Sequence, residues 1–176
     1  MTEKEFVSRI ANNKGDFLQE FLDILEKTKV RFCAIGGLAV NAYAEPVVSL
    51  DLDVVIAADD IALLLDMLKK RYSVTEFSNS INITESASDL RIQIQTDPRY
   101  QSFIERASLK KILGYDMPVA EIEDVFQGKI WAAMDKTRRA SKRQKDMADI
   151  MRLLEYRGDL ISLIPEPLKD KLFPDS

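Results

Sequence analysis

The sequence predicts an α+β fold, in which a mixed β-sheet with flanking helices is followed by a helical C-terminal third. Short segments with the two-residue alternation of β-strands are concentrated between residues 30 and 119, whereas the long segments after residue 121 have helical periodicity. The 176 residues, of which 46 % are hydrophobic and 31 % charged, are sufficient for one buried core. We expect a core with its N-terminal helix over residues 1–120 and a helical segment packed on it over 121–176.

Each expected element follows from a local pattern. The helix 16–29 places its apolar side chains on one stripe, and the strand 90–96 alternates Leu90, Ile92 and Ile94 with polar residues. The expected strands cover 30–35, 50–57, 73–77, 81–84 and 90–96, and residues 111–122 are expected to form a hairpin or two short strands with a turn around Gly114. The expected helices cover 16–29, 38–44, 61–71, 99–107, 122–139 and 142–157, with short pieces near Pro165 and Pro167.

The absence of histidine restricts the possible functions most strongly. The chain contains no His, which excludes Ser-His and Cys-His catalysis, histidine-ligated zinc and a histidine general base. Its one cysteine, Cys33, excludes an intrachain disulfide, and we expect an inert packing residue in a reducing cytoplasm. The longest apolar run, 32–40, is too short to span a membrane, and residues 1–9 lack the apolar stretch of a signal peptide. We therefore expect a cytoplasmic protein without membrane association.

Two carboxylates, Asp51 and Asp53, stand inside the strand pattern 50–57. Because side chains alternate along a strand, both carboxylates project from one face, about 6.5–7 Å apart along the strand. Two acids on one face of a central strand are costly to bury without compensation. Oxygen ligands shared with substrate phosphates are what Mg²⁺ prefers, so we predict that this pair binds Mg²⁺ or Mn²⁺.

A glycine pair, Gly36 and Gly37, lies upstream, where the strand 30–35 meets the helix 38–44. Glycines at such a junction let backbone amides approach a phosphate, and a helix N-terminus favours its negative charge. Either motif alone often has no function. A phosphate-binding turn followed by metal ligands, in this order, is typical of in-line transfer of a nucleotidyl or phosphoryl group.

The order of these motifs resembles the nucleotidyltransferase superfamily of the DNA polymerase β type, especially its minimal and abortive-infection (toxin–antitoxin) branch. The resemblance rests on residues 34–40 (AIGGLAV) and 45–56 (EPVVSLDLDVVI), followed in the same order by 123–129 (EDVFQGK) and 145–150 (KDMADI). It implies a nucleotidyltransferase-like core, a nucleoside triphosphate as substrate, Mg²⁺ or Mn²⁺ as cofactor and, from the toxin–antitoxin branch, a partner protein.

The resemblance also assigns roles to individual residues. Asp51 and Asp53 would be the catalytic residues and the metal ligands. Ser49 would support the loop, and the two lysines of the helical third would face the nucleotide phosphates or the acceptor. The residues that the resemblance assigns to nucleotide binding are Gly36, Gly37, Ser49, Lys129 and Lys145.

Two positions depart from the pattern of that superfamily. The related branch often carries an arginine shortly before its two acids, whereas this chain has Val47 there. The superfamily also needs a third carboxylate on a neighbouring strand, and the matching strand, 90–96, offers Gln93 or Gln95. A glutamine supplies a neutral oxygen, but neither the charge that anchors a metal ion nor a base.

A basic segment lies within the helical third. Seven Lys or Arg and one acid fall between residues 129 and 145, a charge of +6, so the rest of the chain carries −10 within the net −4. Such a segment is either a solvated helix junction or a surface that attracts phosphate, RNA or an acidic partner. Trp131, within it, is expected to be a core residue rather than a platform for base stacking.

Two functions agree with these residues. The first is a Mg²⁺-dependent nucleotidyltransferase that moves a nucleoside monophosphate to a hydroxyl group of RNA, a protein or a small molecule. The second is a catalytically degenerate member of the same fold, which binds a nucleotide or regulates a partner without catalysis. The intact glycine and aspartate pairs favour the first function, whereas Gln93 and Val47 favour the second.

Overall fold

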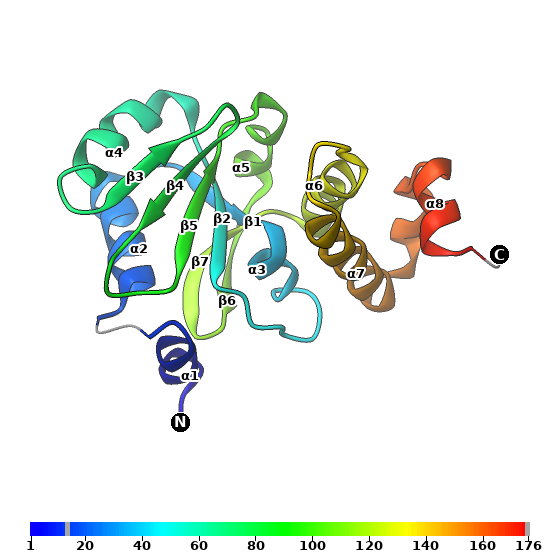
Figure 1. Cartoon of the computed structure of the whole chain (residues 1–176), viewed down its shortest axis with the longest axis horizontal. Coiled ribbons are helices and arrows are strands. Elements are labelled where there is room, and N and C mark those ends of the chain that lie inside the picture. Colours follow the sequence, from blue (N-terminus) through cyan, green and yellow to red (C-terminus); the bar gives the residue numbers. More distant parts are fainter. Residues whose placement is uncertain (13–14, 175–176) are drawn as a thin grey trace.

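The computed structural model describes residues 1–12 and 15–174, and its centre is one mixed sheet of seven strands in the order β3-β4-β5-β2-β1-β7-β6 (Figure 1). Helices lie on both sides of this sheet, which confirms the expected α+β fold class. The strands are β1 (Phe32–Ile35), β2 (Asp51–Ile56), β3 (Ser73–Glu76), β4 (Ser80–Thr84), β5 (Arg91–Gln95), β6 (Ser108–Ile112) and β7 (Tyr115–Val119).

The register of the central strands decides which polar side chains meet. Strand β2 runs antiparallel to β1 and parallel to β5, while β1 also pairs in parallel with β7. Within the β2–β5 pair, Asp51 lies opposite Arg91, and Asp53 lies opposite Gln93. Residues opposite each other in a sheet share a face. One acid therefore has a cation beside it and the other has a neutral amide, while Leu52 and Val54 are fully buried on the other face.

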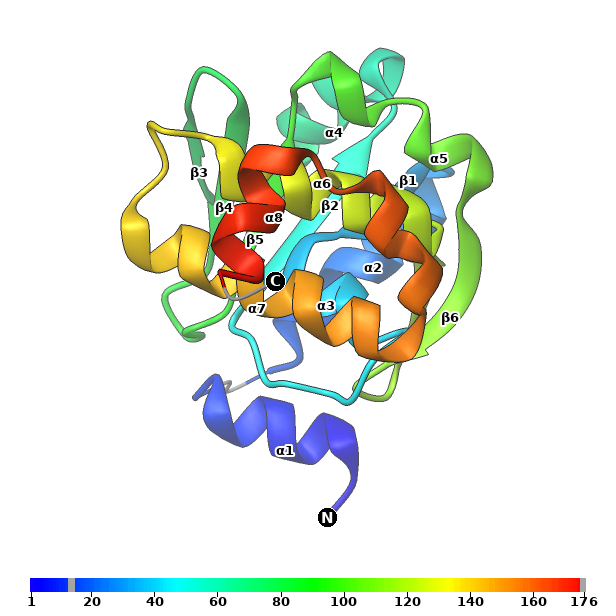
Figure 2. The same cartoon turned by 90° about the vertical axis from the view of Figure 1, so that its right-hand side faces the viewer.

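The helices divide into two groups on opposite faces of the sheet. Helices α2 and α4 lie on one face, and α3, α6 and α7 lie on the other, with α8 outside them (Figures 1 and 2). The helices are α1 (Glu3–Ile10), α2 (Phe17–Thr28), α3 (Gly36–Val40), α4 (Ile61–Leu68), α5 (Phe103–Arg106), α6 (Ile122–Met134), α7 (Ala140–Tyr156) and α8 (Glu166–Leu172). The 3₁₀ turns are η1 (Ala58–Asp60), η2 (Pro98–Tyr100) and η3 (Gly158–Leu163).

Helix α2 shows how the local pattern becomes packing. Its stripe of Phe17, Phe21 and Leu25 is completely buried against the sheet. The side chain of Asp16 accepts a hydrogen bond from the backbone of Gln19 and caps the first turn. On the other face, α6 and α7 pack against each other and against α3, which brings the basic first turn of α7 to the acidic strand β2.

Short elements differ most from the sequence-based expectations. Helix α1 was not expected, although Thr2 and Glu5 form a capping box at its start and Val7 is buried. Helix α3 begins at Gly36 rather than at residue 38, and the expected helix over 99–107 is divided into η2 and α5. Strand β6 also begins before residue 111, and α6 ends before residue 139. Tertiary contacts rather than propensity decide the ends of such short pieces.

Two expectations from the sequence concern membrane association and Cys33. Across residues 1–12 and 15–174, none of the helices combines the length and the apolar character that crossing a bilayer would demand. Cys33 is completely buried in β1, as expected of a packing residue.

Candidate active site

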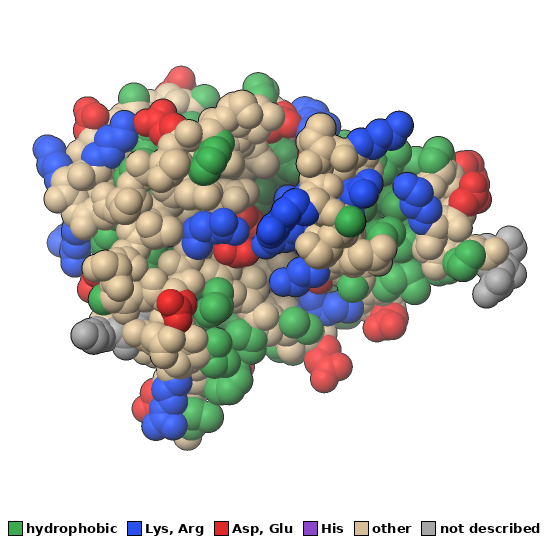
Figure 3. Space-filling view, viewed as in Figure 1, with side chains coloured by type: hydrophobic (Ala, Val, Ile, Leu, Met, Phe, Trp, Pro, Cys, Tyr) green, Lys and Arg blue, Asp and Glu red, His purple; other side chains and the backbone are tan. Residues whose placement is uncertain are grey.

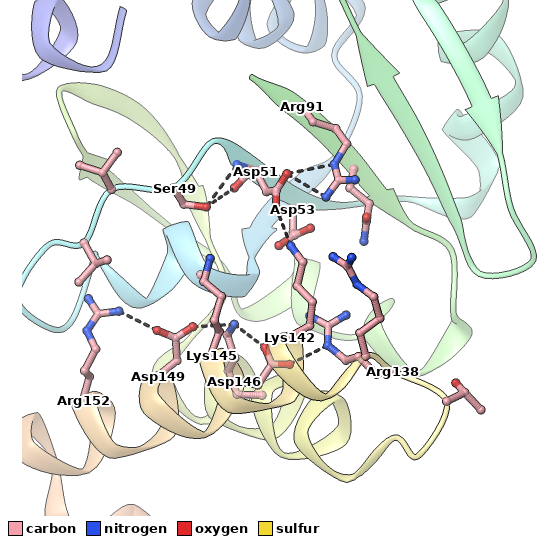
Figure 4. A pocket seen from close by; sticks show the side chains of 17 residues that line it. Ser49, Asp51, Asp53, Arg91, Arg138, Lys142, Lys145, Asp146, Asp149 and Arg152 are labelled. Atoms are coloured by element: carbon pink, nitrogen blue, oxygen red, sulfur yellow. Dashed lines mark hydrogen bonds and ion pairs between the residues drawn. The ribbon is translucent and has the colours of Figure 1, made fainter. Parts of the chain in front are cut away.

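A cavity of about 370 Å³ lies between the polar face of the sheet and helices α6 and α7 (Figure 4). In the space-filling view, basic and acidic side chains gather where the sheet meets these helices (Figure 3). Seven Lys or Arg and four Asp line this cavity. They are Arg91, Lys129, Arg138, Arg139, Lys142, Lys145 and Arg152, and Asp51, Asp53, Asp146 and Asp149.

The cavity gathers six of the seven site residues expected from the sequence. They come from the loop before β2, from β2 itself and from helices α3, α6 and α7. They are Gly37, Ser49, Asp51, Asp53, Lys129 and Lys145. The seventh, Gly36, lines a smaller adjoining hollow of about 70 Å³, which shares Asp53 with the larger cavity.

Asp51, the first residue of β2, forms ion pairs with two cationic side chains. Its Oδ1 accepts a hydrogen bond from Nε of Arg91 at 3.0 Å and forms an ion pair with Nη2 of Arg91 at 2.9 Å, and its Oδ2 lies 3.2 Å from Nζ of Lys142. The backbone N–H of Asp51 donates to Oγ of Ser49 at 3.2 Å, which ties the loop before β2 to the site. The carboxylate of Asp51 is therefore fixed between strand β5 and helix α7 (Figure 4).

The environment of Asp53 differs from that of Asp51. The residue opposite Asp53 on β5 is the neutral Gln93, whereas the residue opposite Asp51 is the cation Arg91. Burial raises the pKa of the Asp53 carboxyl above its usual range; Lys129 opposes this shift, and Asp51 adds to it. The carboxylate lies against the α-carbon of Gly36, whose φ of +69° is a backbone conformation that favours glycine. A partly buried anion beside a second anion is an arrangement that an added cation would stabilise.

Gln93 occupies the place nearest to Asp53 on the neighbouring strand. It lies opposite Asp53 in the β2–β5 pair and lines both the cavity and the adjoining hollow, whereas Gln95 lines the hollow but not the cavity. Of the two positions expected for a third carboxylate, Gln93 is thus the one beside the acidic pair. Its side chain offers an amide oxygen and no charge.

Lys129 lies at the centre of a buried ion-pair cluster. Its Nζ is 2.9 Å from Asp146 and 2.7 Å from Asp149, and only 7 % of the residue is exposed. Burial alone would lower the pKa of Lys129, but Asp149 and Asp146 outweigh it and raise the pKa. Arg138 contacts Asp146 at 2.7 Å, so the acid between the two cations is fully paired.

Lys145 and Arg152 place positive charge at the other end of the cavity. The side chain of Lys145 extends into the cavity toward the loop before β2 (Figure 4). Arg152 contacts Asp149 at 2.7 Å and donates to Oδ1 of Asn41 at 2.9 Å and to the carbonyl of Glu45. Arg152 therefore brings a guanidinium group to the loop in which Val47 stands at the position of the missing arginine.

Arg91 and Arg152 line the cavity, although no sequence motif pointed to either of them. Arg138 and Lys142, which belong to the basic segment 129–145, line it as well, as do Asp146 and Asp149. The two acids of the run KDMADI are three residues apart, which places them on one helical face. Their pairing with Lys129 depends on how α6 and α7 pack, and no local signal gives that.

The donor set at β2 fits one divalent cation. Within the described part of the chain, no cluster of three or more His, Cys, Asp or Glu is arranged to hold a metal ion. Asp51 and Asp53 nevertheless offer carboxylate oxygens on one strand face, and Gln93 offers an amide oxygen beside them. Mg²⁺ is commonly held by one or two carboxylates together with substrate phosphates, so this set is sufficient when a polyphosphate completes it.

Known proteins resemble this chain in structure but not in sequence. Neither a family model nor a curated protein matches it. The antibiotic-resistance factor ANT(2'')-Ia superposes with a TM-score of 0.60 at 10 % identity, over 88 % of this chain and 90 % of its own. The lincosamide antibiotic adenylyltransferase LnuA, with lincomycin bound, gives 0.56 at 12 % identity over 80 % and 98 %. ANT(2'')-Ia in complex with adenylyl-2''-tobramycin gives 0.55 at 13 % identity over 83 % and 95 %. The chain therefore has the fold of nucleotidyltransferases.

Proposed function

We propose that this chain is a Mg²⁺- or Mn²⁺-dependent nucleotidyltransferase, which transfers a nucleoside monophosphate from a nucleoside triphosphate to a hydroxyl acceptor. The observation that carries the proposal is the position of Asp51 and Asp53 on one strand face, directed into a cavity with an excess of cationic side chains. Such a cavity attracts a polyphosphate, and the two carboxylates supply the ligands that Mg²⁺ prefers.

The residues around the cavity would divide the work of binding. Gly37 and Ser49 line the cavity where the triphosphate would bind, and Lys145 extends toward the loop of Ser49 to meet its charge (Figure 4). Lys129 would act mainly through Asp146 and Asp149, because its ammonium group is buried in contact with both. A divalent ion held by Asp51 and Asp53 would neutralise phosphate charge and activate the attacking hydroxyl. The acceptor oxygen would bond to the α-phosphorus and release its proton to solvent as the bond between that phosphorus and the pyrophosphate oxygen breaks.

The candidate acceptors are RNA, a protein and a small molecule. LnuA is described with lincomycin and ANT(2'')-Ia with adenylyl-2''-tobramycin, so small hydroxyl compounds belong in any first acceptor panel. The resemblance to the toxin–antitoxin branch adds transfer RNA and a co-expressed partner protein. We propose the cytoplasm as the compartment, because the single thiol of Cys33 needs no oxidising environment.

The test is label transfer from each of the four α-³²P-labelled nucleoside triphosphates to this acceptor panel, with Mg²⁺ or Mn²⁺. Transfer should be lost in Asp51→Asn. Asp116→Asn is the matched control, because Asp116 also pairs with a lysine at 3.2 Å but lies outside the cavity. Transfer that survives Asp51→Asn would contradict the proposal.

A second candidate is a degenerate module that binds a nucleotide without transferring it. Two observations favour it, namely Gln93 beside Asp53 and the pairing of Asp51 with Arg91. This module would bind nucleotide with measurable affinity and give no label transfer with any of the four nucleotides. Equilibrium dialysis with labelled nucleotide, run beside the transfer assay, separates the two functions.

A further inference from the structure

We propose that this site takes one divalent cation rather than two, and that Arg91 and Lys142 supply the positive charge that a second ion would bring. The inference deepens the proposed function and rests on it. Polymerase-type transfer commonly uses two ions about 3.5–4 Å apart, which stabilise the attacking and the leaving oxygens. Three features of the cavity disagree with a second ion here.

The first feature is the lack of a third carboxylate beside the acidic pair. Across the sheet from Asp53 stands Gln93, and opposite Gln93 on β4 stands Asn82. From β2 across β5 to β4, the side chains in register with Asp53 are therefore two neutral amides. An amide oxygen can complete the shell of one ion, but it does not offset the charge of another.

The second feature is that Asp51 already forms ion pairs with two cationic side chains. Arg91 binds Oδ1 through two nitrogens at 2.9 and 3.0 Å, and Lys142 lies 3.2 Å from Oδ2 (Figure 4). Both carboxylate oxygens thus already face a cation, each from a different element of the fold. A carboxylate that bridged two divalent ions would have to give up both partners, and Arg91 and Lys142 would then lie within repulsive distance of those ions.

The third feature is the charge of the cavity as a whole. Its seven cations and four carboxylates leave an excess of three positive charges. A nucleoside triphosphate with a fully ionised terminal phosphate carries about four negative charges. One divalent ion brings the loaded site to about +1, whereas two would leave it at about +3, so a single ion comes closer to balancing the charge of the triphosphate. Arg91 and Lys142 contact the two carboxylate oxygens of Asp51 and contribute two of these positive charges.

The experiment counts bound Mn²⁺ by electron paramagnetic resonance in the full-length protein. The probes are Mn²⁺ alone and Mn²⁺ with inorganic tripolyphosphate, corrected for tripolyphosphate without protein, so the count needs neither turnover nor a known nucleotide. We expect one protein-bound ion per chain, lost in Asp53→Asn. Two ions per chain, or none, would overturn the inference.

A double variant tests why the second ion is excluded. Gln93→Asp combined with Lys142→Met supplies the missing charge and removes a competing cation, so we expect the count to rise to two. Gln93→Asn with Lys142→Met keeps a neutral amide and should stay at one. A count of one in both would contradict the role assigned to Gln93 and Lys142.

A single variant covers the case in which the double variant fails to fold by circular dichroism. Lys142→Met should tighten Mn²⁺ binding by roughly threefold to tenfold, because Asp51 loses a competing cation at a partly exposed position. Lys111→Met, at the exposed pair with Asp116, should leave the Kd unchanged. An unchanged or weaker affinity in Lys142→Met would refute the competition.

The ion count tests the single-ion site, and the transfer assay tests the proposed enzyme, so either proposal can be refuted without the other. One bound ion without label transfer would support the single-ion site and refute the proposed enzyme. Label transfer with two bound ions would support the enzyme and refute the single-ion site.

Discussion

The carboxylate of Asp53 lies directly against the α-carbon of Gly36, so the turn into α3 and the second acid of β2 occupy one space. A β-carbon at position 36 would be 2.9 Å from the β-carbon of Asp53, closer than real β-carbons approach other atoms. The φ of Gly36, +69°, lies in the left-handed region. Gly36 is therefore needed for the packing of the site, in addition to any contact with a ligand.

Gly36→Ala should destabilise the protein by about 1–3 kcal/mol, because it combines a left-handed φ with a clash against Asp53. Thermal unfolding followed by circular dichroism measures this loss. Gly37→Ala is the matched control: its nearest neighbour, Oδ2 of Asp149, would lie 3.7 Å from the new β-carbon, an ordinary contact. Equal losses in the two variants would mean that Gly36 does not have the special role described above.

Lys129→Met should be among the most destabilising single changes in the site. It leaves Asp146 and Asp149 without the ammonium group that lies between them, and removing one partner of a buried pair typically costs about 3–5 kcal/mol. Lys111→Met, at an exposed pair with Asp116, should change stability by less than about 1 kcal/mol. Urea unfolding of both variants measures the difference, and similar midpoints would contradict a structural role for Lys129.

Regular periodicity made the fold predictable. Alternation between Leu90 and Gln95 gave β5, and it also placed Gln93 on one face with Arg91. Helix α1 went unpredicted although Thr2 and Glu5 have the spacing of a capping box, because its segment is short and the burial of Val7 depends on tertiary contacts. The fold class thus followed from long patterned segments, while short elements depended on contacts between distant residues.

The candidate site was predictable only as separate motifs. The spacing of Asp51 and Asp53 showed that they share a face, but Lys142 reaches Asp51 across 91 residues of sequence. That contact requires α7 to pack over β2, and Arg91 becomes a partner only through the β2–β5 register. The electrostatic balance of the site therefore arises from tertiary structure, and no local pattern encodes it.

Cys33 should be unreactive in the folded protein. Burial, with a smaller contribution from Asp124, raises the pKa of the Cys33 thiol to about 12, so the nucleophilic thiolate is scarce near neutral pH. Ellman's reagent at mildly alkaline pH should therefore release no thiol signal from the native protein. The same assay in concentrated guanidinium chloride should detect the one thiol of each chain. Rapid reaction without denaturant would show that β1 opens more readily than its burial implies.

Asp53→Asn should stabilise the folded chain while it removes metal binding and transfer. The wild-type carboxylate is enclosed beside Asp51, and the raised pKa of Asp53 reflects the unfavourable burial of its charge, only partly offset by Lys129. An amide of nearly the same shape carries no charge, so this cost of burial disappears. A stabilising substitution of this kind commonly raises the free energy of unfolding by about 0.5–2 kcal/mol. Asp116→Asn, at a side chain that is 59 % exposed, is the control and should leave the melting temperature unchanged. A lower melting temperature in Asp53→Asn would mean that Lys129 stabilises the ionised carboxylate by more than its burial costs, because the amide would have lost that attraction.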